Sequence, residues 1–141
     1  MLRAAMVASD ENGNGASMDG GTARVRTIIV AGQSSQRTRK VLHALRGFTN
    51  VIWPTSLESA LAQTRSNDAG CLVIADDLSE EPIDEFLQEA RELRRSLPIF
   101  VITDPDDVAE AVSAMRHGAT KVIEIPPSYA ALCDEVMRAV Q

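Results

Sequence analysis

The chain has 141 residues, a formal net charge of −6, 45% hydrophobic residues and only 4% aromatic residues. This length fits one domain with an aliphatic core, and the negative charge argues against a nucleic-acid-binding surface. No apolar run approaches the roughly 20 residues of a membrane span. The N-terminus lacks the apolar core of a signal peptide, so we expect a cytoplasmic protein without membrane contact.

The first 24 residues are predicted to form a disordered tail. They contain the turn-forming runs Asp10–Gly15 and Asp19–Gly21 and have almost nothing to bury. We expect one folded domain over residues 25–141.

Short aliphatic runs alternate with helical patterns through this domain. Strands are expected at Thr27–Ala31, Asn50–Trp53, Cys71–Ala75, Pro98–Thr103 and Lys121–Ile125. Helices are expected at Gln36–Arg46, after Thr55 or Ser56, at Ile83–Arg95, between Asp107 and His117, and at Tyr129–Val140. Strict alternation with short loops predicts right-handed βαβ crossovers and therefore an α/β fold with a doubly wound, five-stranded parallel sheet and five helices.

Two helical patterns carry specific expectations. The second helix is expected to point Leu57, Ala60 and Leu61 inward, and the fourth places Val108, Ala111, Val112 and Met115 on one face. The two cysteines, Cys71 and Cys133, lie far apart in the sequence and are predicted to be buried free thiols.

The apolar run Cys71–Ala75 ends abruptly in Asp76 and Asp77. A short aliphatic run without alternation is typical of a strand that is covered on both faces. Since ligands bind outside the carboxyl ends of the strands in open parallel sheets, the two acids are expected at the rim of such a crevice. The alternative is an ordinary strand-end loop in which an acid caps the following turn.

The stretch from Leu97 to Ala119 resembles a known family in the order and spacing of its strand, Thr103, helix and Gly118-Ala119 pair. It is similar to the fourth strand and fourth helix of receiver domains of bacterial response regulators, in particular those of nitrogen-fixation-type transcriptional regulators. The resemblance extends over residues 25–141 and implies the flavodoxin-like strand order 2-1-3-4-5.

Receivers of this family are phosphorylation switches. They need an acidic pair after the first strand, an Asp after the third, a Thr or Ser after the fourth, and Lys-Pro after the fifth. The acids hold Mg²⁺, which takes hard oxygen ligands. The metal ion and the Lys then neutralise the charge on the phosphoryl oxygens.

The resemblance implies that this chain keeps part of that site and has lost the rest. The acid positions fall on Ala31, Gly32 and Gln33, the phosphoacceptor on Asp76 with Asp77 as the alternative, the switch residues on Thr103 and Val122, and the Lys-Pro pair on Ile125 and Pro126. One carboxylate cannot build the usual metal cage, so we expect no Mg²⁺, no cofactor and no phosphoryl transfer from phosphohistidine.

Other candidate groups favour structural roles. Asp104, Asp106 and Asp107 precede a helix, where acids cap N–H groups, and are not expected to bind a metal ion. His43 and His117 stand near helix ends without an evident partner.

Together these observations predict a signalling module that is not an enzyme. It would act through protein–protein contact, as the regulatory domain of a transcriptional regulator, and form a homodimer through the fourth helix, fifth strand and fifth helix. The candidates on that face are Ala111, Ala114, Arg116, Lys121 and Glu124. The alternatives are a genuine phosphorylation switch that uses Asp76 and a sensor of small molecules that uses the same crevice.

Overall fold

The computed structural model describes residues 26–48, 50–78, 81–124 and 129–140. The expectations for residues 1–24 and for Ile125 and Pro126 lie outside these ranges. In the part of the chain that is described, no helix is long and apolar enough to cross a membrane.

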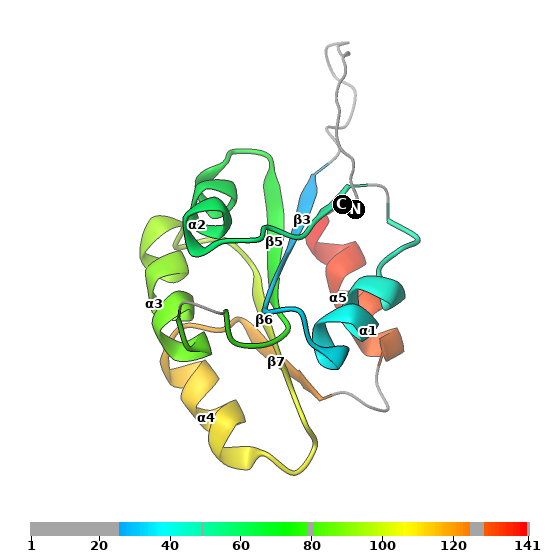
Figure 1. Ribbon diagram of the computed structural model, residues 1–141, viewed down its shortest axis with the longest axis vertical. Coiled ribbons are helices and arrows are strands. Elements are labelled where there is room, and N and C mark those ends of the chain that lie inside the picture. Colours follow the sequence, from blue (N-terminus) through cyan, green and yellow to red (C-terminus); the bar gives the residue numbers. More distant parts are fainter. Residues whose placement is uncertain (1–25, 49, 79–80, 125–128, 141) are drawn as a thin grey trace.

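Five parallel strands form one sheet (Figure 1). They are β3 (Thr27–Ala31), β4 (Val51–Ile52), β5 (Ala69–Ile74), β6 (Ile99–Thr103) and β7 (Lys121–Glu124). The spatial order is β4-β3-β5-β6-β7, and every neighbouring pair is parallel. Counted along the chain this is the order 2-1-3-4-5, so the predicted fold class is confirmed.

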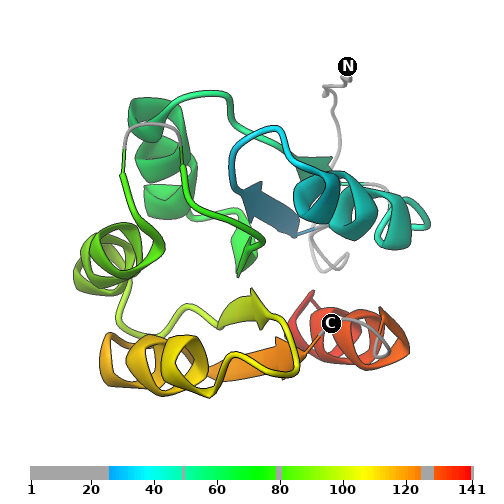
Figure 2. The ribbon, with the colours of Figure 1, turned by 60° about the horizontal axis from the view of Figure 1, so that its bottom comes forward.

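Five helices cover the two faces of the sheet. They are α1 (Gln36–Ala44), α2 (Leu57–Arg65), α3 (Ile83–Leu93), α4 (Val108–Arg116) and α5 (Tyr129–Val140). Helices α1 and α5 lie on one face, and α2, α3 and α4 lie on the other, as Figures 1 and 2 both show. The first and third helices are each two residues shorter at their C-terminal ends than the sequence predicted.

The strands supply a core on each face. Ile28 and Val30 of β3 pack toward α1 and α5, whereas Ile29 and Ala31 pack toward α2 and α3, because successive strand residues point to opposite faces. Every residue of the central strand β5 is buried, which is typical of a strand covered on both sides.

Both cysteines are free, as predicted, but of the two only Cys71 is fully buried. Cys71 is buried in β5, and this burial raises the pKa of its thiol to about 12. Cys133 on α5 is half-buried, and its thiol lies 3.4 Å from the carbonyl oxygen of Ala44.

Three of the helices begin at side-chain caps, of which Ser56 and Asp107 are among the residues that the sequence indicated. Ser35 accepts a hydrogen bond from the backbone N–H of Thr38 in α1, and Ser56 does the same for Ser59 in α2. Asp107 caps α4 by accepting from the N–H of Glu110. Each cap satisfies a backbone donor that the helix itself leaves without a partner.

Helix α4 differs from the other helices in what it buries. Ala114 is its only fully buried side chain. Val108, Val112 and Met115 are 68%, 47% and 51% exposed. The apolar face expected for this helix therefore exists, but most of it faces solvent.

Candidate functional site at the carboxyl ends of the strands

The sheet has its topological switch point beside β3. The chain leaves β3 for α1 on one face and leaves β5 for α3 on the opposite face. In open parallel sheets such a divergence opens a crevice at the carboxyl ends of the two strands. The residues that follow β3, β5 and β6 therefore form the candidate site.

Gly32 directly follows β3, and its neighbours Thr38 and Asp76 leave no space there for a side chain. Its φ angle is +152°, and a Cβ atom there would lie 2.7 Å from Thr38 Oγ1 and 2.9 Å from the backbone nitrogen of Asp76. Both the backbone conformation and the close approach favour glycine. An acidic residue at this position would force its neighbours apart.

Trp53 closes the same corner from the side of α2. Its indole Nε1–H donates a 2.9 Å hydrogen bond to the carbonyl oxygen of Gly32. Trp53 is the chain's single tryptophan, so its fluorescence reports on this part of the crevice.

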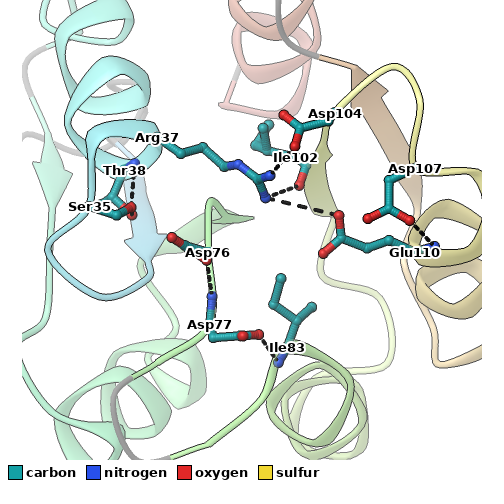
Figure 3. Close-up of polar contacts among 10 residues, drawn as sticks. All are labelled: Ser35, Arg37, Thr38, Asp76, Asp77, Ile83, Ile102, Asp104, Asp107 and Glu110. Atoms are coloured by element: carbon teal, nitrogen blue, oxygen red, sulfur yellow. Dashed lines mark hydrogen bonds and ion pairs between the residues drawn. The ribbon is translucent and has the colours of Figure 1, made fainter.

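Asp76 and Asp77 lie at the rim, as the sequence predicted, and both bond to the backbone (Figure 3). Asp76 is half-buried, and its Oδ1 accepts from the N–H of Asp77 at 2.8 Å. Asp77 is exposed, and its Oδ1 accepts from the N–H of Ile83 at 2.8 Å. Since Pro82 makes no side-chain cap, Asp77 caps α3 in its place.

Thr103 ends β6 and is fully buried. Its hydroxyl oxygen has no hydrogen-bond partner among the described residues. Val122 of β7 is half-buried and packs against the core on the side of α2, α3 and α4.

Arg37 enters the site although the sequence analysis did not predict it. Its guanidinium group lies 2.9 Å from Asp104 Oδ2, 3.4 Å from the carbonyl oxygen of Ile102 and 4.0 Å from Glu110 Oε1. Figure 3 shows the side chain extended from α1 toward the loop between β6 and α4. A cation in the first turn of a helix is unfavourable for the helix dipole, and this was the available signal that Arg37 has a partner elsewhere.

The two acids near Arg37 differ in their exposure to solvent. Glu110 of α4 is 27% exposed, and Asp104 is 60% exposed. Burial raises the pKa of Glu110, and Asp107, Asp104 and Asp77 raise it further, while Arg37 lowers it. The guanidinium therefore favours the charged form of Glu110 against the effect of burial and of the neighbouring acids.

A second feature lies beside the crevice, on the exposed face of α4. A hollow of about 440 Å³ is lined by Ala111, Val112, Met115, Arg116 and Val122. Arg116, Lys121 and Glu124 are exposed and Ala111 is half-buried, so these four interface candidates are accessible. The prediction for Ala114 is wrong, because its side chain is fully buried under α4.

Comparison with solved structures shows which proteins share this architecture. No family model matches the chain. A putative response regulator from Chloroflexus aurantiacus superposes with a TM-score of 0.71 at 21% identity, over 82% of this chain and 98% of that one. The receiver domain of a sensor histidine kinase from Pseudomonas aeruginosa, solved with magnesium in its active-site cleft, superposes with a TM-score of 0.65 at 16% identity, over 82% and 98%. The chain has the fold of a response-regulator receiver domain.

One curated sequence is similar to part of the chain. It is the C4-dicarboxylate transport transcriptional regulatory protein DctD of Pseudomonas aeruginosa, 39% identical over 71 residues. The match covers 49% of this chain and 15% of that protein, so the chain spans a small part of the relative's length.

The receiver fold implies a magnesium ion, and the described residues do not fit one. Ala31 ends β3 and Gly32 follows it, both without a carboxylate, and Gln33 offers only an amide. Nowhere in residues 26–48, 50–78, 81–124 and 129–140 do three His, Cys, Asp or Glu side chains converge closely enough to hold a metal ion. Hard divalent cations need several oxygen ligands, and Mg²⁺ requires near-octahedral geometry.

Proposed function

We propose that this chain is a cytoplasmic signalling module of the receiver fold that works through protein–protein contact, without phosphoryl transfer, enzymatic activity or a cofactor. The observation that carries the proposal is the backbone at Gly32. A side chain there would collide with Thr38 and with the backbone of Asp76. Gly32 is one of the three positions, with Ala31 and Gln33, on which the resemblance to receivers places their acidic pair, and its surroundings favour glycine.

Electrostatics gives the reason that phosphoryl transfer is not expected. The transferred group carries negative charge that must be neutralised as the transition state forms. Asp76 and Asp77 would add negative charge to it, and the positions after β3 provide no metal ligands that could offset this. Both acids also have backbone hydrogen bonds to make in the folded chain.

We further propose that the output surface is the face of α4, β7 and α5, and that it forms a homodimer. The exposed Val108, Val112 and Met115 give this face apolar area to bury. Charged side chains border it, including Arg116 of α4 and Lys121 of β7, which pairs with Glu135 of α5. An apolar centre with a polar rim is the usual organisation of a protein interface.

The similarity to a transcriptional regulator suggests the setting in which such a dimer acts. A receiver-like domain that dimerises can bring two output domains together, so we propose a regulatory role for this chain in transcription. The DNA contacts would belong to the output domain, in keeping with the net charge of −6 on this chain.

Phosphorylation is tested directly with acetyl phosphate and Mg²⁺, followed by intact-mass measurement. We expect no mass gain in the wild-type chain and the same result for Asp76→Asn. A gain of one phosphoryl group in the wild type that disappears in Asp76→Asn would overturn the proposal. Beryllofluoride with Mg²⁺ should likewise leave the fluorescence of Trp53 unchanged.

Dimerisation is tested by analytical ultracentrifugation over micromolar concentrations. Met115→Glu places a charge in the apolar face and should weaken the dimer at least tenfold. The matched control, Gln88→Glu, adds the same charge at an exposed position on α3 and should have no effect. A monomeric wild type at the highest concentration would contradict the proposed interface.

One observation favours a second candidate, a phosphorylation switch that uses Asp76. The Thr103 hydroxyl is buried and has no hydrogen-bond partner in the described part of the chain, which costs free energy unless some group satisfies it. In receivers the equivalent hydroxyl binds the phosphoryl group. Thr103→Val separates the candidates: it should leave the free energy of unfolding unchanged or raise it, and under the second candidate it would also abolish the response to acetyl phosphate.

A further inference from the structure

Helix α4 needs an anchor other than apolar packing. Only Ala114 among its residues is fully buried, although the helix carries the proposed interface. Elements that bury little apolar area open more readily than the rest of a domain. Polar contacts must therefore contribute much of what holds α4 in place.

Arg37 makes such a contact from a distant part of the chain. It belongs to α1, on one face of the sheet, whereas α4 lies on the other (Figures 1 and 3). Its guanidinium reaches over the carboxyl edge of β6 to Asp104 at 2.9 Å and to Glu110 at 4.0 Å. Arg37 is only 24% exposed, so the group is partly shielded from water and salt.

The shape of the guanidinium suits these partners. Its five N–H donors point in different directions in one plane, so they can donate to the Asp104 carboxylate and the Ile102 carbonyl together. The contact with Glu110 is electrostatic, because its Oε1 has no hydrogen-bond partner among the described residues. The oxygens it reaches belong to Asp104, Ile102 and Glu110 and are not gathered into a metal cage. A covalently attached cation therefore fits where a small divalent ion does not.

The charges around Arg37 would repel one another without it. Glu110 interacts unfavourably with Asp107, Asp104 and Asp77, and Arg37 is the cation that offsets them. Loss of the guanidinium would leave like charges at the N-terminal turn of α4 and in the loop before it.

We infer that Arg37 is an intramolecular latch, a cation carried by α1 that ties down the β6–α4 loop and the first turn of α4 across the crevice. It thereby fixes the orientation of the exposed apolar face of α4. The significance of that face rests on the proposed function, but the latch itself does not.

The test is amide hydrogen exchange, measured by mass spectrometry in the full chain. Arg37→Gln removes the charge, and Arg39→Gln removes an equivalent charge from the same helix, where the side chain bonds only Ser34 among the described residues. We expect exchange in residues 104–113 to be about two- to fivefold faster in Arg37→Gln than in the control, as for loss of a partly exposed ion pair.

A double-mutant cycle provides a second readout. Asp104→Asn should produce most of the same increase, and adding it to Arg37→Gln should produce little more, because both remove one interaction. Equal exchange in Arg37→Gln and Arg39→Gln would overturn the latch. So would an increase spread evenly over all strands and helices, which would indicate general destabilisation.

Measurements on the same variants distinguish failure of the latch hypothesis from failure of the proposed function. If the wild type takes up phosphate or stays monomeric while Arg37→Gln loosens residues 104–113, the proposed function fails and the latch remains. If the wild type dimerises but exchange does not respond to Arg37→Gln, the reverse holds.

Discussion

Helices α3 and α4 lie beside each other on the same face of the sheet but are held there in different ways. Helix α3 buries Ile83, Phe86, Leu87 and Ala90 in the core. Helix α4 fully buries Ala114 alone, and its Ser113 and Glu110 make polar contacts with α3 and α1.

The two helices therefore depend on different kinds of interaction. Salt screens partly exposed ion pairs but has little effect on apolar burial, so the position of α4 is expected to be more sensitive to salt than that of α3. The following substitutions test this contrast, beginning with the largest expected effect.

Phe86→Ala should lower the free energy of unfolding by about 3–5 kcal/mol, because it leaves a cavity in the core on the α3 side. Met115→Ala on α4 removes an exposed side chain and should cost less than about 0.5 kcal/mol. Urea denaturation followed by circular dichroism measures both. Similar losses in the two variants would contradict the contrast.

Arg91→Ala should cost about 2–3 kcal/mol, since hydrogen bonds to a charged group are lost and carbonyls are left without partners. Arg91 of α3 donates to the carbonyl oxygens of Gly118 and Leu97 at 2.9 and 2.7 Å, and it also bonds Thr120 Oγ1. The control Arg116→Ala, exposed on α4, should cost little.

The variant Arg91→Lys tests whether the charge of Arg91 or the shape of its guanidinium group is responsible for this stabilisation. A lysine keeps the charge but lacks the planar fork that reaches several acceptors, so it should recover only a small part of the loss. Full recovery would mean that charge alone stabilises this end of α3.

Ser113→Ala tests the direct contact between the two helices. The Ser113 hydroxyl of α4 donates to Asp84 Oδ2 of α3 at 2.6 Å. We expect a loss of about 1 kcal/mol in the free energy of unfolding and faster amide exchange in α4 than in α3. Ser96→Ala, in the exposed loop after α3, is the control.

Glu81→Gln should have the smallest effect, one that depends on pH. Burial, followed by the neighbours Glu89 and Glu85, raises the pKa of Glu81 to about 7. The folded chain therefore binds this proton more tightly than the unfolded chain, and its stability falls as pH rises from about 4.5 to about 7. The variant should gain stability relative to wild type at pH 8 but not at pH 4, and an equal gain at both pH values would contradict this assignment.

The sequence was sufficient to predict a five-stranded parallel sheet, and the resemblance to receiver domains supplied its strand order. Five aliphatic runs with turn residues between them mark the strands, and Ser56 and Asp107 mark where two of the helices begin. The ends of the elements were less predictable. The second strand has two residues instead of four, because the pairing of an edge strand depends on its neighbour and not on propensity alone.

The candidate site was predicted only in part. Asp76, Asp77 and Thr103 lie at strand ends, as their positions after aliphatic runs indicated. Arg37 was missed because its partners are 67 and 73 residues away, a relation that helical periodicity does not encode. The exposure of Val112 and Met115 was also not evident, because a hydrophobic stripe has the same spacing whether it meets the core or solvent.

Cys71 offers a measurement that follows from its place in the central strand. Its thiol is sealed between the two layers, and with a pKa of about 12 it holds almost no nucleophilic thiolate near neutral pH. An alkylating reagent can modify it only after the core between the sheet and helices α1 and α5 opens to solvent, so the modification rate of Cys71 measures how often that layer opens.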